Sequence, residues 1–227
     1  EVNRHTTNVI VDDRTLYEIY LPAFKAAVQE GNTWAIMGSY NLYKDQHVCH
    51  NQYLLNDILK GEWGFDGVVV SDWGGVHDTD QAITNGLDME FGSWTNGLSN
   101  GTSNAYDNYY LAQPYLERIK SGKVGTKELD DKVRRILRLA FRTTMDRNRP
   151  YGTMRSPEHY EAARKIGEAG IVLLQNNNDL LPIDLDNTKK IAVIGENAVK
   201  MMTVGGGSSS LKVQREISPL DGIRNRV

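Results

Sequence analysis

The segment at residues 67–75 constrains the fold most, because an apolar run ends abruptly in a carboxylate and glycines. Three consecutive valines lead into Ser71 and Asp72, and two glycines follow Trp73. A continuous β-branched run is typical of a strand that is buried on both faces, as in parallel sheets. The glycines end the strand, so we expect Asp72 at its carboxyl end. In parallel α/β folds this edge carries the ligand site. Asp is equally well suited to capping a helix, so position alone leaves both roles open.

Strands and helices alternate around this segment. We expect strands at residues 33–37, 67–71 and 87–91, with helices at residues 52–60 and 79–85 between them. This order is the signature of parallel β/α units. Three units are too few to close a barrel of eight strands. The segment is therefore either a small open sheet or the second half of a barrel.

The remainder of the chain is predicted to be mainly helical, with a second α/β segment near its end. Its helices are expected at residues 16–28, 109–121, 126–145 and 156–169, a loop at residues 92–107, and a strand at residues 190–195. The Lys and Arg residues of the helix at 126–145 are expected to form a solvated face.

Composition and charge exclude several classes of partner. The 227 residues carry a formal net charge of -3, which argues against nucleic acid as a partner. No stretch approaches the roughly 18 apolar residues that cross a membrane, so no membrane partner is expected. Cys49 is the single cysteine, so the chain has no internal disulfide. A secreted or periplasmic location is favoured over a cytoplasmic one.

Three weaker patterns bear on metal, nucleotide and hydrolase chemistry. His47 and His50 flank Cys49, but no second pair of residues follows at ligand spacing, so no metal is expected. The glycines near the end of the chain match neither the dinucleotide-binding nor the P-loop pattern, so no nucleotide cofactor is expected. His77 precedes two aspartates that could form a hydrolase dyad with it, although a polar surface loop is the preferred interpretation.

Polar and aromatic residues follow two of the expected parallel strands. Met37 ends one strand and Tyr40 follows it, and Asp72 and Trp73 follow the other, so they share one rim of the sheet. A carboxylate beside aromatic rings suits a sugar site, because such rings stack on pyranoses and a carboxylate can attack the anomeric carbon. Rim residues that only cap and pack are the alternative, and the residues alone leave both open.

A series of short motifs, in a fixed order along the chain, resembles the β-glucosidase branch of glycoside hydrolase family 3. The motifs lie at residues 1–6, 37–41, 61–67, 70–73, 86–90, 169–175, 191–195, 205–208 and 218–224. The resemblance implies an α/β fold, namely a (β/α)8-like barrel followed by an α/β sandwich domain. Its implied divisions are residues 1–145 for the second half of the barrel, 146–189 for a linker and lead-in helix, and 190–227 for the start of the sandwich.

The resemblance also implies a function and a set of site residues. Its sugar-cleaving members are retaining exo-glycosidases, so the implied substrate is a β-glucoside or oligosaccharide with a terminal β-D-glucosyl residue. Asp72 would be the nucleophile. Sugar contacts would come from Arg4, Met37, Tyr40, Trp73 and, more weakly, Ser208.

Departures from the family pattern limit what this chain is expected to do alone. A Lys-His pair should lie upstream of Glu1, an aspartate should come from the first half of the barrel, and the acid/base glutamate should lie beyond Val227. Retaining chemistry needs two carboxyl groups about 5–5.5 Å apart. We therefore expect the remainder of a longer polypeptide as a partner, and no activity from these residues alone. The alternatives are a β-xylosidase, another glycosidase of the family, or an inactive sugar-binding module.

Overall fold

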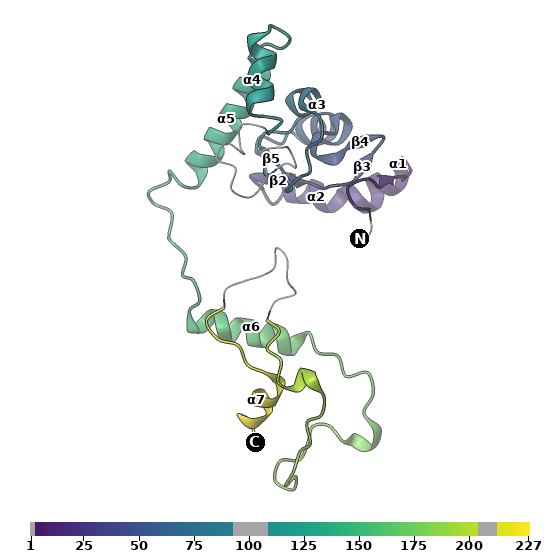
Figure 1. Cartoon of the computed structure of the whole chain (residues 1–227), viewed down its shortest axis with the longest axis vertical. Helices are drawn as coiled ribbons and strands as arrows, with labels where there is room; N and C mark the ends of the chain where they lie inside the picture. The colour runs from purple at the N-terminus through teal and green to yellow at the C-terminus, as the bar shows by residue number, and fades with distance from the viewer. Residues whose placement is uncertain (1–2, 93–108, 204–212) are drawn as a thin grey trace. The chain divides into compact units, whose positions relative to one another are not determined.

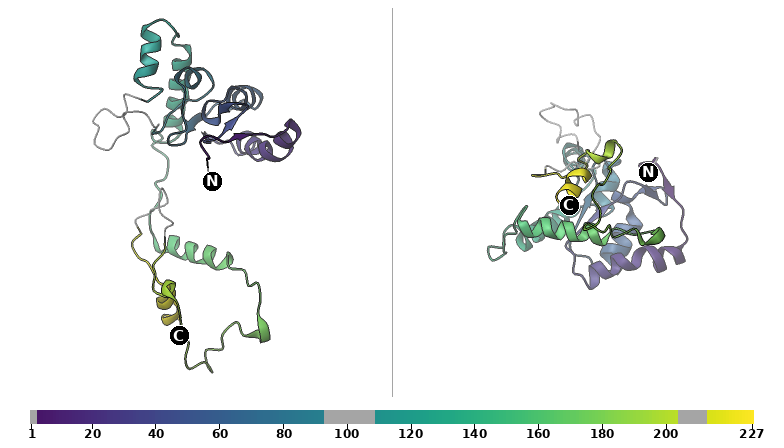
Figure 2. Two further views of the ribbon diagram at one scale, coloured as in Figure 1. Left: turned by 45° about the vertical axis from the view of Figure 1, so that its right-hand side comes forward. Right: turned by 90° about the horizontal axis from the view of Figure 1, so that it is seen from below.

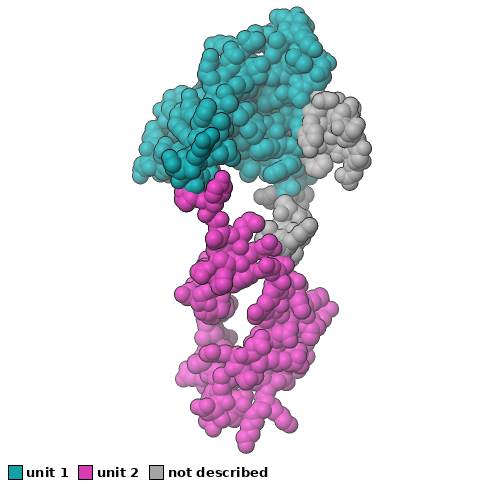
Figure 3. Space-filling view, turned by 90° about the vertical axis from the view of Figure 1, so that its left-hand side faces the viewer, with its two compact units in different colours: residues 1–149 teal, residues 150–227 magenta. Residues whose placement is uncertain are grey.

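The computed structural model describes residues 3–92, 109–203 and 213–227, which divide into two compact units. Unit 1 comprises residues 1–149 and unit 2 comprises residues 150–227 (Figures 1 and 3). The loop expected at residues 92–107 falls outside the described residues, except for its first residue.

Two parallel strands form the centre of unit 1. β2 (Ala35–Gly38) and β5 (Val68–Ser71) lie side by side, with Met37 opposite Val70 and Gly38 opposite Ser71 (Figure 1). The strands expected at residues 33–37 and 67–71 are confirmed, with small shifts of their ends. This register brings the carboxyl ends of both strands to the same edge of the sheet.

The third expected strand, at residues 87–91, is wrong as a strand. A single parallel bridge joins Val70 to Met89. Two side-chain oxygens accept hydrogen bonds that backbone carbonyls would accept in a regular β-ladder. The backbone N–H of Val69 donates to Asp88 Oδ2 at 2.8 Å, and the N–H of Phe91 donates to Ser71 Oγ at 2.8 Å. The segment still runs alongside β5, so it carries its own side chains to the same edge.

A second, smaller sheet consists of one strand that precedes β2 and two strands that follow it. β1 (Asn8–Val9) pairs in parallel with β3 (Leu42–Tyr43), and β3 pairs antiparallel with β4 (Gln46–His47). Lys44 and Asp45 form the two-residue hairpin loop with φ values of 51° and 62°. Positive φ at both positions is what a type I′ hairpin turn requires. The hairpin returns the chain toward the end of β2.

Helices cover the central strands of unit 1. They are α1 (Asp13–Thr15), η1 (Leu16–Tyr20), α2 (Leu21–Gln29), η2 (Val48–His50), η3 (Tyr53–Glu62), α3 (Thr79–Thr84), α4 (Gln113–Lys120) and α5 (Lys127–Arg142). The expected helices of this unit are confirmed, with α4 and α5 shorter than predicted. The apolar face of η3 packs with Trp63 and Phe65 against Val69 and Leu87 in one core. None of the described helices is long and apolar enough to cross a membrane.

The expectation that the cations of α5 form a solvated face is wrong for two of them. The Lys132 Nζ is buried and donates to the carbonyls of Leu87 and Ala82, and burial lowers its pKa to about 8. Arg135 donates to the carbonyls of Phe65 and Gly67 at 2.9 and 3.0 Å. These cations bind carbonyl groups that flank β5, so α5 holds the strand from outside.

Unit 2 contains α6 (Pro157–Ala169), η6 (Asn177–Asp179), η7 (Glu196–Ala198) and α7 (Pro219–Arg224), seen from further directions in Figure 2. The side chain of Ser156 accepts from the His159 N–H and begins α6, as expected from the sequence. The strand predicted at residues 190–195 is wrong, because the described part of unit 2 has no strand. A strand needs a partner for its backbone groups, and here Ile194 is largely exposed instead.

Candidate functional site

A cavity of about 510 Å³ opens where β2 and β5 end. Its lining comes from the N-terminal segment, the end of β2 with the residues after it, and the residue after β5: Arg4, Thr7, Met37, Ser39, Tyr40, Asn41 and Asp72. Four of the residues singled out from the sequence, Arg4, Met37, Tyr40 and Asp72, are therefore brought together. Ser208 lies outside the described residues.

A tight turn fixes the Asp72 carboxylate at the end of β5. Asp72 Oδ1 accepts a hydrogen bond of 2.7 Å from the Trp73 N–H, and the Asp72 carbonyl accepts one of 3.0 Å from the Gly75 N–H. The helix that follows, α3, is capped instead by Asp78, which accepts from the Gln81 N–H at 2.8 Å. Helix capping is therefore not the role of Asp72, which was one of the two interpretations left open by the sequence.

Tyr40 lies beside Asp72 on the wall that follows β2. Burial raises the pKa of the Tyr40 phenol, and the neighbouring Asp72 carboxylate raises it further. Cationic and aromatic groups lie against its ring: the Arg4 guanidinium carbon is 4.8 Å and the His5 ring centroid is 4.2 Å from the ring centroid of Tyr40. Tyr40 thus remains a protonated donor at neutral pH and lines the same cavity as the carboxylate.

Trp73 faces a neighbouring cavity rather than the one that holds Asp72. This second cavity, of about 520 Å³, is lined by Trp73, by the segment that includes Glu90, Phe91 and Gly92, and by three residues just before α4. Trp73 is 62% exposed, and its ring stacks on Phe91, with ring centroids 5.5 Å apart and an angle of 19° between the planes. An exposed aromatic face beside a carboxylate is suited to stacking on a flat, apolar ligand face.

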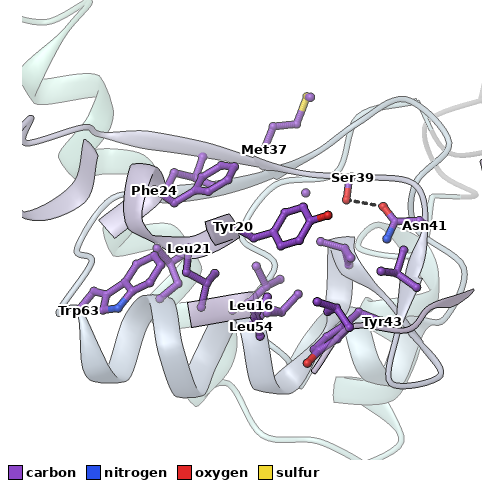
Figure 4. Close-up of a pocket in the computed structure, with 17 residues that line it drawn as sticks. Leu16, Tyr20, Leu21, Phe24, Met37, Ser39, Asn41, Tyr43, Leu54 and Trp63 are labelled. Atoms are coloured by element: carbon purple, nitrogen blue, oxygen red, sulfur yellow. Dashed lines mark hydrogen bonds between the residues drawn. The ribbon is translucent and has the colours of Figure 1, made fainter. Parts of the chain in front are cut away.

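Sequence reasoning did not single out Thr7, Ser39, Asn41 or Phe91. Ser39 Oγ donates to Asn41 Oδ1 at 2.8 Å (Figure 4). This hydrogen bond joins the residues on either side of Tyr40. The signal for these two was present, because they flank Tyr40 in the motif at residues 37–41. Phe91 was obscured by its assignment to a strand, and Thr7 carries no comparable signal.

Cys49 is fully buried behind the cavity and is not suited to nucleophilic chemistry. Its Sγ lies 3.4 Å from the carbonyl oxygen of Ser39. Burial raises the pKa of the thiol to about 11, so it stays protonated at neutral pH.

The histidines that raised metal and dyad hypotheses are engaged in other contacts. The ring centroids of His47 and His77 are 3.8 Å apart in a stacked arrangement. Asp78 caps α3, and Asp80 pairs with Arg118 and Lys123, so neither aspartate supports a dyad. Within residues 3–92, 109–203 and 213–227, no group of three or more His, Cys, Asp or Glu side chains is arranged to hold a metal ion.

Two protein-family models match most of the chain. The model of the glycosyl hydrolase family 3 N-terminal domain matches residues 1–139, and that of the family 3 C-terminal domain matches residues 171–227. The chain belongs to glycoside hydrolase family 3. The family 3 chain has the α/β character predicted for it, with the described parallel strands inside the region of the N-terminal model.

Relatives of this family 3 chain extend well beyond it. Beta-glucosidase BoGH3A of Bacteroides ovatus is 50% identical over 99% of this chain and 31% of its own length. A β-glucosidase solved from Streptomyces venezuelae, DesR with D-glucose, has a TM-score of 0.84 at 33% identity, over 99% of this chain and 29% of that one. Beta-glucosidase 3B of Thermotoga neapolitana with α-D-glucose has a TM-score of 0.81 at 30% identity, over 99% and 30%. The chain thus spans about a third of the length of such relatives.

Proposed function

We propose that this chain belongs to a retaining exo-β-glucosidase, which releases terminal non-reducing β-D-glucosyl residues. The observation that carries the proposal is the position of Asp72, whose carboxylate lines a polar cavity beside Tyr40 and Arg4. Supporting it, the named relatives are β-glucosidases, and two solved relatives are described with bound glucose. The proposal concerns the protein expressed from the complete reading frame that encodes these residues.

The proposed chemistry is a double displacement. An Asp72 carboxylate oxygen attacks the anomeric carbon as the bond to the leaving oxygen breaks, and a separate acid group protonates that oxygen. A glycosyl ester on Asp72 results, and water then cleaves it with the same separate group acting as base. The Tyr40 hydroxyl lies beside the attacking carboxylate, and the Trp73 N–H donates a hydrogen bond to Asp72 Oδ1.

The sugar contacts follow from the lining of the two cavities. Arg4 supplies a cation for sugar hydroxyls, Met37 lines the same cavity, and Trp73 offers an exposed face to the leaving group from the neighbouring cavity. We assign Ser208 to the same site only on the family resemblance. No metal or cofactor takes part in the proposed reaction.

We further infer that unit 1 is the second half of a (β/α)8-like barrel. Parallel β2 and β5, the bridge at Met89 and the intervening helices support this assignment. The divisions at residues 145 and 189, with the start of a sandwich domain at residue 190, remain part of the proposal.

These 227 residues expressed alone should not hydrolyse glucosides. Among the described residues that line the Asp72 cavity, Asp72 is the only carboxylate. Retaining glycosidases need two such groups, so the first displacement would lack its acid. Release of p-nitrophenol from p-nitrophenyl β-D-glucopyranoside by the isolated chain would contradict this expectation.

Asp72→Asn in the protein from the complete reading frame tests the nucleophile. We expect a loss of turnover by several orders of magnitude with retained glucose binding, since the amide keeps the shape but not the nucleophilicity. Asp57→Asn, at an exposed carboxylate of η3, is the control and should retain wild-type rates. Wild-type turnover by Asp72→Asn would exclude the assignment.

Covalent labelling provides a second, independent test. A 2-deoxy-2-fluoro β-glucoside with a good leaving group should label Asp72 in the wild-type protein, as read by peptide mass spectrometry. Labelling at another residue would contradict the mechanism. The exposed tryptophan after Asp72 favours glucosidase over xylosidase, so p-nitrophenyl β-D-xylopyranoside should be the poorer substrate. Glucose binding without turnover of either substrate would instead indicate a sugar-binding module.

A further inference from the structure

Three histidine rings pack together behind Tyr40. The ring centroids of His47 and His77 are 3.8 Å apart with an angle of 23° between the planes, and His50 meets His47 edge-on at 5.6 Å. The proposed function uses none of these rings. They come from two different chain segments, one that follows β2 and Tyr40 and one that follows β5 and Asp72.

Hydrogen bonds connect these rings to both walls of the site. His47 Nδ1 lies 3.2 Å from the carbonyl oxygen of Tyr40, so it acts as the donor. His50 Nε2 accepts from the His77 N–H at 3.2 Å, which leaves His50 Nδ1 as the donor to Gln81 Oε1 at 3.1 Å. The stack is thus anchored to the Tyr40 backbone at one end and to α3 at the other.

The geometry requires rings that are not all charged. Two imidazolium rings at 3.8 Å would repel each other, because like charges at such distances interact strongly away from bulk water. Burial lowers the pKa of His47 and His50, and burial with the neighbouring histidines lowers that of His77 to about 4. His5 is a further titratable neighbour, and Asp78 is the acidic group near His50.

We propose that the stacked rings of His47 and His77 position the Tyr40 hydroxyl beside the Asp72 carboxylate, by joining the segment after β2 to the segment after β5. The Tyr40 carbonyl is held by His47, whose ring is supported by His77 five residues beyond Asp72. The effect of this positioning on catalysis rests on the proposed function. The histidines are positioning residues, because they act through Tyr40 and do not line the Asp72 cavity.

A mutant cycle in the protein from the complete reading frame tests the proposal. His77→Ala removes the support and should lower kcat for p-nitrophenyl β-D-glucopyranoside about tenfold, since small misplacements at a reacting group are costly. KM should change little. His77→Phe should restore most of the rate, because a flat ring at this position can still stack and the hydrogen bond to His50 comes from the backbone.

The Tyr40→Phe background separates positioning from general stability. If the stack acts through the Tyr40 hydroxyl, His77→Ala should cost less than about twofold in that background, which is the non-additivity expected of coupled residues. An equal loss in both backgrounds, or wild-type kcat in His77→Ala, would overturn the proposal. Circular dichroism of each variant checks that the protein is folded.

A spectroscopic measurement reads the same contact without any activity. The ¹³Cζ resonance of Tyr40, identified by its loss in Tyr40→Phe, reports ionisation of the phenol. The raised pKa of Tyr40 should move back toward 10 in His77→Ala, because the hydroxyl leaves the carboxylate, and should stay raised in His77→Phe. An unchanged Tyr40 pKa in His77→Ala would overturn the proposal. Absence of glucosidase turnover in a wild-type protein with the expected Tyr40 titrations would overturn the proposed function alone.

Discussion

Lys60 and Asp88 form an ion pair of 2.7 Å in which the Asp88 side chain is fully buried. The second carboxylate oxygen of Asp88 accepts from the Val69 N–H at 2.8 Å, in the middle of β5. Burial of a charge is unfavourable unless partners compensate it, and here both oxygens are bonded. Asp88 therefore links Lys60 of η3 to β5, the strand that ends just before Asp72.

Replacing Asp88 by Ala should destabilise unit 1 by about 3–5 kcal/mol, because it leaves the Lys60 cation buried without its partner. Hydrogen exchange measured by mass spectrometry should show faster exchange in peptides over β5 and η3. Asp130→Asn, at an exposed position in the first turn of α5, is the matched control and should change the stability by less than about 0.5 kcal/mol. Equal protection in Asp88→Ala and in the control would contradict the prediction.

The parts of the fold that could be predicted depend on local signals. The valine run and its glycines define β5 within one short segment, and the helical apolar periodicity defines η3 and α5. Parallel pairing then follows from the strand–helix–strand order. These signals were sufficient to place Met37, Tyr40 and Asp72 at one edge.

The parts that could not be predicted depend on partners far away in the sequence. Asp88 replaces a ladder bond of Val69, and Arg135 binds a carbonyl 68 residues before it, at Gly67. Periodicity alone cannot tell such a cation from a solvated one. The hairpin turn at Lys44 and Asp45 lacks the glycine by which most type I′ turns are predicted from sequence. The residues at 190–195 have the pattern of a buried strand but no described partner.

Gly75→Ala should destabilise the protein in a way that Cys49→Ala relieves. A Cβ at Gly75 would lie 2.6 Å from Cys49 Sγ, an atom that Cys49→Ala removes. A Cβ at Gly38 would lie 2.7 Å from Cys49 Cα, which Cys49→Ala retains, and 3.0 Å from Sγ, so Gly38→Ala is the control that should be rescued less. Thermal unfolding midpoints of the single and double variants provide the measurement.

The size of this rescue is expected to be on the order of 1–2 kcal/mol, since overpacking of a tight interior typically costs 1–3 kcal/mol. Part of the cost should remain, because the Gly75 Cβ would also lie 3.2 Å from the Asp72 carbonyl oxygen. Additive effects of Gly75→Ala and Cys49→Ala would show that the contact with Sγ is not what limits this position.

Gly92→Ala should displace Trp73 and weaken the binding of aromatic leaving groups. Gly92 has a φ of +55°, and a Cβ there would lie 2.2 Å from Trp73 Cδ1. We expect KM for p-nitrophenyl β-D-glucopyranoside to rise severalfold, while the dissociation constant for glucose changes little. Gly122→Ala is the control, with a φ of +73° and no atom within 4 Å of the new Cβ.

Both glycine variants should share a backbone cost of about 1 kcal/mol for a side chain at positive φ. Only Gly92→Ala should alter the KM. Equal kinetic behaviour of Gly92→Ala and Gly122→Ala would show that the Trp73–Phe91 pair does not depend on the close approach of Gly92.

Acid should destabilise unit 1 through the stacked histidines. Burial and neighbouring histidines lower the pKa of His77 from its usual 6.5 to about 4. Between these values the unfolded chain binds a proton that the folded chain excludes, so stability rises with pH. The contribution is fully present above about pH 6.5 and is lost as the pH falls toward 4, and the lowered pKa values of His47 and His50 add to it in the same direction.

Unfolding midpoints measured across this range should fall less in His77→Phe, which cannot take up the proton, than in the wild-type protein. His159→Phe, at an exposed histidine of unit 2, should follow the wild-type pH profile. Identical profiles for His77→Phe and wild type would show that His77 does not contribute to the acid loss of stability.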